Sequence, residues 1–246
     1  MKVFDARTVY GTGFMKPPVS ENIGAHLKAC ETERAVIVME EQLYLPPDES
    51  LIIARNRVAS HPGAYGLVML APACTGEMPP VEKTASLFKR ERFAGFLLSP
   101  AELNIPFRPV FLSAELEAAQ RFDIPVFYHV SGKENTMEYA ADVLSAYSSL
   151  RMVLSFADEW PNTRKIYPLL LAFPGLCVCL SEFVWMGGIE DFCNRFGSER
   201  LLYSSSFPTR YPGGSMLMLK NAEITQQDKD NIAYRNLERL IGGMAL

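Results

Sequence analysis

Several apolar segments of the chain end in an acid, a base or a fixed cation, which are the side chains that could do chemistry. Histidine and carboxylates are the usual proton carriers in enzymes, whereas arginine binds carboxylates and phosphates through a permanent positive charge. The sequence therefore predicts an acid–base or anion-binding site, with His129 and Glu182 as catalytic candidates. The expected ligand-binding residues are Asp5, Arg7, His129, Asp158, Glu182 and Ser206.

These residues can meet only if the fold brings the ends of their segments together. The chain alternates apolar runs, typical of buried strands, with amphipathic helical patterns. The expected strands are 3–6, 35–39, 65–72, 93–100, 124–130, 150–156, 176–181 and 200–206. The expected helices are 21–30, 47–62, 79–91, 113–123, 134–149, 162–174, 188–197 and 225–242.

Strands that alternate with helices indicate a parallel sheet with right-handed crossovers. Eight such units predict a single-domain (β/α)8 TIM barrel over residues 1–246, with its functional groups at the carboxyl ends of the strands. An open doubly wound sheet is the main alternative, and it normally carries a G-x-G-x-x-G turn after its first strand. The corresponding segment here reads ARTVYGTGF, which lacks that pattern.

Composition narrows the function classes. A net charge of −4 disfavours nucleic-acid binding, and the longest apolar runs fall well short of the about 20 residues of a membrane span. The N-terminal segment has no apolar core of a signal peptide, so we expect a cytoplasmic protein. An odd number of cysteines, five, does not indicate a disulfide framework.

Four strand-end segments and the last helix resemble the amidohydrolase-related proteins of the metal-dependent hydrolase superfamily, the branch that includes decarboxylases and small lactonases. The segments are FDARTVYG, PVFYHVSG, MVLSFADEW, LLYSSSFP and NLERLIG (236–242). In that family the first strand ends D-x-H-x-H, the fifth ends in a metal-binding histidine, the sixth ends H-x-G and the eighth reads G-S-D-x-P. The resemblance covers nearly the whole chain and implies a TIM barrel.

The departures from the family pattern concern its metal ligands. Arg7 and Val9 stand at the two histidines of the first strand, Phe156 at the histidine of the sixth and Ser206 at the aspartate of the eighth, whereas His129 retains the histidine of the fifth. Zinc needs three or four ligands, which His129 alone does not supply. We therefore expect no metal cofactor. We also expect the Arg7 guanidinium to replace the cation and bind a carboxylate or phosphate.

Structural alternatives remain open for each of these residues. Arg7 could form a buried ion pair with Glu182 or Asp5, and His129 could be a hydrogen-bonded core residue. Asp158 could belong to a solvated turn. The two other histidines, His26 and His61, are expected at the surface.

The resemblance and its departures leave three functions open. The first is a barrel without the family metal that binds a small anion, with hydrolase or lyase activity or none. The second is an active metal-dependent hydrolase or decarboxylase with an unusual site built from His129, Glu182 and Asp158. The third is a non-catalytic module for binding or subunit interaction, and a homodimer is compatible with each.

Overall fold

A computed structural model of the chain describes residues 1–13, 18–79, 84, 87–88, 90–106, 108–130, 136–156, 163–182 and 185–244. For a few of these residues, among them Phe156 and Glu182, only the backbone is described.

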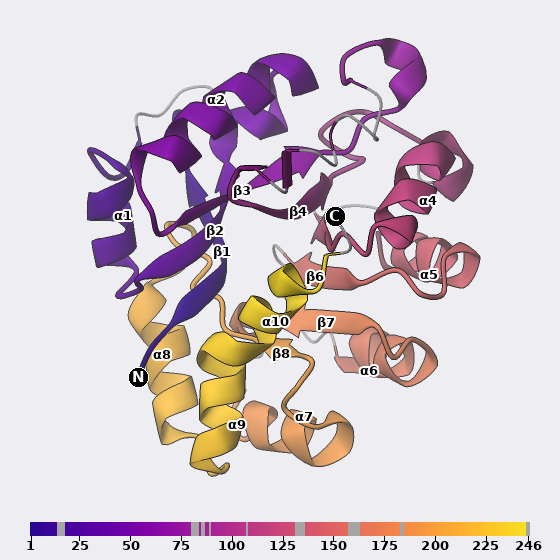
Figure 1. Cartoon of the computed structure of the whole chain (residues 1–246). Coiled ribbons are helices and arrows are strands. Elements are labelled where there is room, and N and C mark those ends of the chain that lie inside the picture. The colour runs from indigo at the N-terminus through magenta and orange to yellow at the C-terminus, as the bar shows by residue number, and fades with distance from the viewer. Residues whose placement is uncertain are drawn as a thin grey trace.

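The strands form one parallel sheet in the order β1 to β8 (Figure 1). Backbone hydrogen bonds from Ala6 to Tyr203 and from Val9 to Phe207, both 2.8 Å, join the last strand to the first. The predicted (β/α)8 barrel is therefore confirmed. The strands are β1 (Phe4–Tyr10), β2 (Arg34–Met39), β3 (Ala64–Met69), β4 (Phe93–Leu98), β5 (Val126–Val130), β6 (Met152–Phe156), β7 (Leu176–Cys179) and β8 (Leu201–Leu202).

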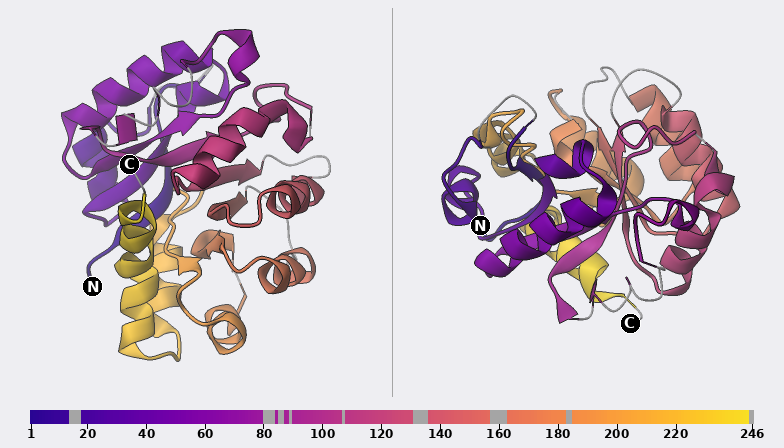
Figure 2. Two further views of the ribbon diagram at one scale, coloured as in Figure 1. Left: turned by 45° about the vertical axis from the view of Figure 1, so that its right-hand side comes forward. Right: turned by 90° about the horizontal axis from the view of Figure 1, so that it is seen from above.

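Helices lie outside the strands on each side of the barrel (Figure 2). They are α1 (Ile23–Ala29), α2 (Pro47–Ser60), α4 (Ser113–Arg121), α5 (Thr136–Ala146), α6 (Thr163–Ala172), α7 (Gly188–Phe196), α8 (Pro212–Asn221), α9 (Gln226–Asp230) and α10 (Asn236–Gly242). A π-helical turn, Asn231–Arg235, joins α9 to α10. The helix expected over 79–91 lies largely outside the described residues.

The sequence prediction missed α8 and misplaced the ends of most strands by two to four residues, with the largest errors in β1 and β8. Helix α8 begins Pro-Gly-Gly, and glycine is a poor helix former, so its helical pattern is weak. Strand β1 runs on to Tyr10, and β8 comprises only Leu201 and Leu202 before the chain leaves the regular ladder.

The core has two layers that follow from the alternation of side chains along each strand. Inward-facing residues such as Phe4, Val36, Leu67, Phe127 and Val153 fill the inside of the barrel. Their sequence neighbours face outward and pack against the helices in a second cluster. Because both faces of the strands are buried, the strands read as continuous apolar runs in the sequence.

The C-terminal helix closes the N-terminal end of the barrel. Tyr234, Leu237 and Leu240 belong to the interior cluster together with Phe4, at the start of β1. The Arg151 guanidinium, just before β6, donates to the Leu240 carbonyl at 2.8 Å. The site must therefore lie at the opposite, carboxyl end of the strands. Among the described residues no helix has the length and apolar character to cross a membrane.

Candidate functional site

Arg7 points into the barrel because β1 contains a β-bulge. The pairing of β1 with β2 shifts between Asp5 and Thr8, so that β1 has one residue more than its partner there. A bulge re-aims the side chains beside it, and both Ala6 and Arg7 line the same interior cavity. The Arg7 guanidinium is buried, with its Nη2 atom 3.4 Å from Nδ1 of His129 and its Nη1 atom 3.5 Å from Oγ of Ser206.

His129 faces Arg7 from β5 and has a carboxylate on its other side. Its Nε2 atom lies 3.7 Å from Oε1 of Glu102, which follows β4, and the Ser99 hydroxyl donates to the same carboxylate. Burial, together with the charge of Arg7, lowers the pKa of His129 to about 4, although Glu102 acts in the opposite direction. The ring is therefore neutral at pH 7. Because arginine can only donate, Nδ1 accepts from Arg7, and the ring proton lies on Nε2, toward Glu102.

Asp5 is fully buried beneath Arg7 and supports the backbone of the site. Its Oδ1 atom accepts the backbone N–H groups of Arg7, at 2.9 Å, and of Ser205, at 3.0 Å. Burial raises the pKa of Asp5 to about 7, although these hydrogen bonds and the Ser205 hydroxyl lower it. Asp5 therefore joins β1 to the segment after β8, and its carboxyl group is only partly ionised at neutral pH.

Ser206 contacts Arg7 from a strained backbone conformation. Its φ angle of 52° lies in the left-handed region, which a non-glycine residue adopts at a cost. Its hydroxyl donates to Ser181 at 2.9 Å, and Ser204 makes a similar contact with Ser181. A small serine cluster after β7 and β8 thus holds Ser206 against Arg7.

The side chains of two expected site residues, Asp158 and Glu182, are not described, so their predicted roles stay predictions. Asp158 lies outside the described residues. The backbone of Glu182 ends the short turn Leu180–Glu182 after β7, at the carboxyl end of the barrel, but its side chain is not described.

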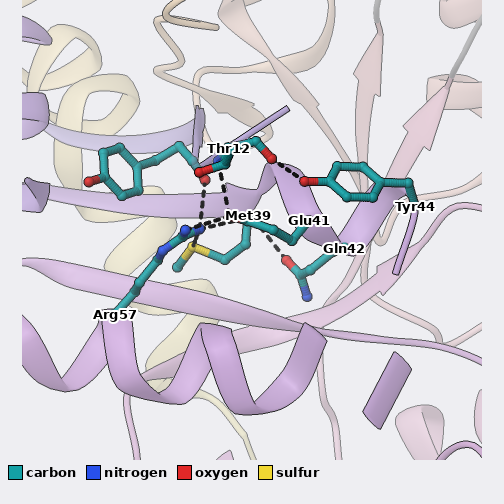
Figure 3. A network of polar contacts seen from close by, with 7 residues as sticks. Thr12, Met39, Glu41, Gln42, Tyr44 and Arg57 are labelled. Carbon is teal, nitrogen blue, oxygen red and sulfur yellow. Dashed lines mark hydrogen bonds and ion pairs between the residues drawn. The ribbon is translucent and has the colours of Figure 1, made fainter. Parts of the chain in front are cut away.

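Glu41, just after β2, belongs to a network of hydrogen bonds and an ion pair that holds the local structure (Figure 3). Its carboxylate accepts hydrogen bonds from both terminal nitrogens of Arg57. It also accepts one from the backbone N–H of Thr12, at 2.9 Å. The Tyr44 hydroxyl donates to the Thr12 carbonyl. Although burial acts to raise it, the hydrogen bonds from Arg57 and Thr12 hold the pKa of Glu41 below its ordinary value. This network fixes the backbone at Thr12, just after β1.

His26 is buried, so the expectation that it lies at the surface was wrong. It packs behind β1, where its Nε2 atom lies 2.7 Å from Oγ1 of Thr8. Because the Thr8 hydroxyl donates to the Phe207 carbonyl, His26 must be the donor in this contact. A histidine on the inner face of an amphipathic helix is hard to distinguish from a surface residue when the helix is short.

Sequence reasoning also missed Glu102 and Ser155. Glu102 lies three residues beyond Ser99, in the loop after β4, whereas the search for site residues stopped at the strand end. Ser155 pairs with His129 across β5 and β6 and faces the cavity, one residue before the expected Phe156. No partner satisfies its buried hydroxyl within the described part of the chain.

The site is a line of polar groups across the mouth of the barrel, from Ser206 through Arg7 and His129 to Glu102. The cavity beneath Arg7 and His129 measures about 10 Å³, room for about one water molecule. This cavity is too small for a ligand larger than water. The arrangement offers a fixed cation, a neutral imidazole with a defined tautomer and a carboxylate that orients it.

Solved structures share this fold over nearly their whole length. An uncharacterized TIM-barrel protein from Bordetella bronchiseptica is 16% identical, with a TM-score of 0.75, and the match covers 98% of this chain and 99% of that one. A 2,6-dihydroxybenzoate decarboxylase from Rhizobium is 10% identical, with a TM-score of 0.73 and coverage of 98% and 99%.

A third structure contains a metal ion and an aromatic acid. It is a 5-carboxyvanillate decarboxylase from Novosphingobium aromaticivorans, complexed with manganese and 4-hydroxy-3-methoxy-5-nitrobenzoic acid. It is 11% identical, with a TM-score of 0.72, and the match covers 98% of this chain and 96% of that one. Identities this low show a shared fold. No curated protein matches the chain.

The described surroundings of Nδ1 of His129 disfavour a divalent cation at that nitrogen. The Arg7 guanidinium lies against Nδ1 of His129, and its positive charge would repel a metal ion at that nitrogen. Where the structure describes side chains, no group of three or more histidine, cysteine, aspartate or glutamate residues is arranged to hold a metal ion.

The family itself follows from the sequence. The model of the amidohydrolase family matches residues 56–243, about three quarters of the chain. This range contains β3 to β8, His129, Glu102 and the helix that closes the barrel. The chain belongs to the amidohydrolase family.

Proposed function

We propose that the protein binds a small carboxylate at the mouth of the barrel through Arg7, without a metal ion. The observation that carries the proposal is the contact between the Arg7 guanidinium and Nδ1 of His129. It puts a permanent cation beside the histidine that, by the resemblance, would otherwise bind the family metal. A planar guanidinium donates two parallel hydrogen bonds to a carboxylate, which a point charge cannot do.

The surroundings of Arg7 support this role. A buried guanidinium cannot lose its proton, so a counter-charge stabilises it. Burial raises the pKa of the nearby Asp5 carboxyl to about 7, so this carboxyl is partly protonated at neutral pH. Two structurally similar decarboxylases act on aromatic carboxylates by their names, which favours a carboxylate over a phosphate.

Ligand binding would change the role of His129. In the unliganded protein Nδ1 accepts a hydrogen bond from Arg7. A carboxylate that engages Nη2 of Arg7 would release Nδ1, and the neutral imidazole could then take the proton of a hydroxyl group on the ligand, which leaves an imidazolium and a ligand oxyanion. Glu102 then stabilises the imidazolium that results, as carboxylates do beside catalytic histidines. This sequence of contacts would permit lyase or hydrolase chemistry on a bound carboxylate without a metal.

The test is ligand-induced thermal stabilisation by acetate, benzoate and phosphate. We expect benzoate to raise the Tm of the wild type and to bind Arg7→Met roughly ten- to a hundred-fold more weakly, since a charge-assisted hydrogen bond contributes about 1.5–3 kcal/mol. Arg55→Met is the matched control, because Arg55 is exposed on α2 and pairs only with Glu91 among the described residues. This control should respond like the wild type.

Three results would overturn the proposal. Equal stabilisation of wild type and Arg7→Met would place the anion elsewhere, and no stabilisation by any of the three anions would favour a non-catalytic interaction module. One equivalent of a transition metal in protein purified without chelator would instead support an unusual metal-dependent enzyme.

A further inference from the structure

A second cavity lies on the outer wall of the barrel, between α2 and the segment that leads into β4. Its volume is about 490 Å³, within the range of about 300–1,000 Å³ that is typical of small-molecule sites. Side chains of α2 line one side, and Arg90 and Arg92 line the other. Because Arg92 precedes β4 whereas Glu102 follows it, this cavity lies toward the opposite end of β4 from the candidate site.

We propose that this cavity binds a nucleoside monophosphate, with the phosphate on Arg90 and Arg92 and the nucleoside along α2. The inference goes beyond the proposed function, because it concerns other residues and another ligand. It assigns the protein a second binding site that takes no part in the chemistry at the mouth of the barrel.

Arg92 is a cation that the fold already holds in place. Its Nε atom donates to the Ala64 carbonyl at 3.3 Å, and its Nη2 atom donates to the carbonyls of Val58 and, at 3.2 Å, of His61. As far as the described residues show, these bonds leave Nη1 to donate to a ligand. A guanidinium that is fixed beforehand loses little conformational freedom when it binds an anion.

The charge of the cavity favours a phosphate. Three arginines and one glutamate are among the described residues that line it. Arg90 is exposed and lies two residues before Arg92, so both guanidinium groups are available to one ligand. A phosphate monoester carries a charge of about −1.5 to −2 at neutral pH, so it matches this excess of positive charge better than a carboxylate does.

Glu91 favours a ligand that also carries hydroxyl groups. Its carboxylate accepts two hydrogen bonds from Arg55, of 2.7 and 3.0 Å, and this ion pair reduces its repulsion of a phosphate. An ionised carboxylate has about four acceptor positions, so it can accept further hydrogen bonds. Carboxylates bind ribose hydroxyls in this way in other nucleotide-binding folds.

Helix α2 offers a surface for the base. Ile52, Asn56 and Ala59 line the cavity, and their spacing of four and three residues places them on one face of the helix. Ile52 is 61% exposed, so a flat ring has apolar side-chain surface to cover. The Asn56 amide has both donors and an acceptor for the edge of a base.

Isothermal titration calorimetry with AMP, GMP, CMP and UMP tests the site, with the free nucleosides, ribose 5-phosphate and inorganic phosphate as fragments. At about 0.15 M salt, general attraction between distant exposed charges is largely screened. We expect at least one monophosphate to bind roughly ten-fold or more tightly than each of its fragments, because every fragment lacks the phosphate contacts or the contact with α2.

Two variants separate charge from shape. Arg90→Met should weaken binding of that monophosphate roughly ten-fold, since a charge-assisted hydrogen bond is lost. Arg195→Met is the matched control, because it removes the same charge from an exposed ion pair on α7, and binding should not change. Ala59→Phe should block the base at an exposed position without changing the charge, whereas Ala59→Ser should bind like the wild type.

The outcomes keep this site and the proposed function apart. Equal weakening by Arg90→Met and Arg195→Met would show general charge attraction, and no binding of any monophosphate would likewise overturn the site. Ribose 5-phosphate that binds as tightly as the monophosphates would contradict the place of the base on α2. Arg7→Met should leave nucleotide binding unchanged, and a loss there would place the nucleotide at the mouth of the barrel.

Discussion

The two ends of the barrel are built from different chemistry. At the N-terminal end, the side chains of Tyr234, Leu237 and Leu240 fill the opening, and Tyr234 packs on Phe4 with ring centroids 5.9 Å apart. At the carboxyl end, a guanidinium and an imidazole occupy the corresponding interior position. The first end is closed by apolar contacts, and the second is lined by polar groups.

The N-terminal end of the barrel stabilises the fold, whereas groups at the carboxyl end destabilise it. Apolar burial at the N-terminal end stabilises the fold. The mouth instead contains a buried cation, a carboxyl group with a raised pKa and a strained serine, each of which opposes folding. Features that oppose stability and cluster at one place are typical of functional sites.

The largest expected effect lies at the N-terminal end. Leu237 is buried within the interior cluster, so Leu237→Ala should lower the free energy of unfolding by about 3 kcal/mol through lost burial and a residual cavity. Urea denaturation measures this loss. The affinity for benzoate at the mouth should not change, and a parallel loss of binding would contradict the separation of the two ends.

The next effect is acid destabilisation through a histidine behind the mouth. Burial lowers the pKa of His26 from 6.5 to about 4. Between these two values the unfolded state binds more protons than the folded state, so stability decreases as the pH falls from 6.5 to 4. The contribution of His26 is about 2–3 kcal/mol.

In His26→Gln, the free energy of unfolding should decrease less as the pH falls, because the contribution of His26 is removed. The contribution of His129 remains, and it also decreases stability at low pH, since the pKa of His129 is lowered too. Denaturation curves of both proteins at pH 7 and pH 4.5 provide the comparison. An equal loss of stability in the two proteins would show that His26 does not titrate in this range.

Asp5 should change the pH dependence of stability in the direction opposite to His26. Burial raises the pKa of Asp5 from its ordinary value of 3.8 to about 7, so the folded state binds the extra proton between these values and stability falls as the pH rises. Asp5→Asn keeps an oxygen acceptor for the N–H groups of Arg7 and Ser205 but has no charge. Relative to wild type, this variant should gain about 1–3 kcal/mol on going from pH 5 to pH 8. A constant difference across that range would contradict the raised pKa.

The smallest effect is expected on the outer surface. Arg55 forms an exposed ion pair with Glu91, 2.7 Å between nitrogen and oxygen. Exposed pairs contribute about 0.2–1 kcal/mol, so Arg55→Met should change stability little. A loss above about 1 kcal/mol would show that this peripheral ion pair contributes more than exposed pairs do.

The repeating pattern of strands and helices was sufficient to predict the barrel, because strands buried on both faces and amphipathic helices differ strongly in periodicity. Single elements were harder. Helix α8 starts with two glycines, and β8 forms two ladder residues although its apolar run is longer. In both, tertiary contacts outweigh the local preference of the residues.

The site was predictable only where it coincides with the strand ends. Arg7 and His129 were identified from their positions, and the structure places them in contact. The β-bulge that aims Arg7 inward depends on the pairing with β2, which no local pattern encodes. Glu102 reaches His129 from a loop, so its contact depends on the path of the chain after β4.

The most direct test of the central claim is a crystal structure of the protein with benzoate. The account predicts that both carboxylate oxygens lie within hydrogen-bond distance of the Arg7 guanidinium, with no metal ion at His129. A metal ion coordinated by His129, or a benzoate whose carboxylate binds away from Arg7, would contradict it.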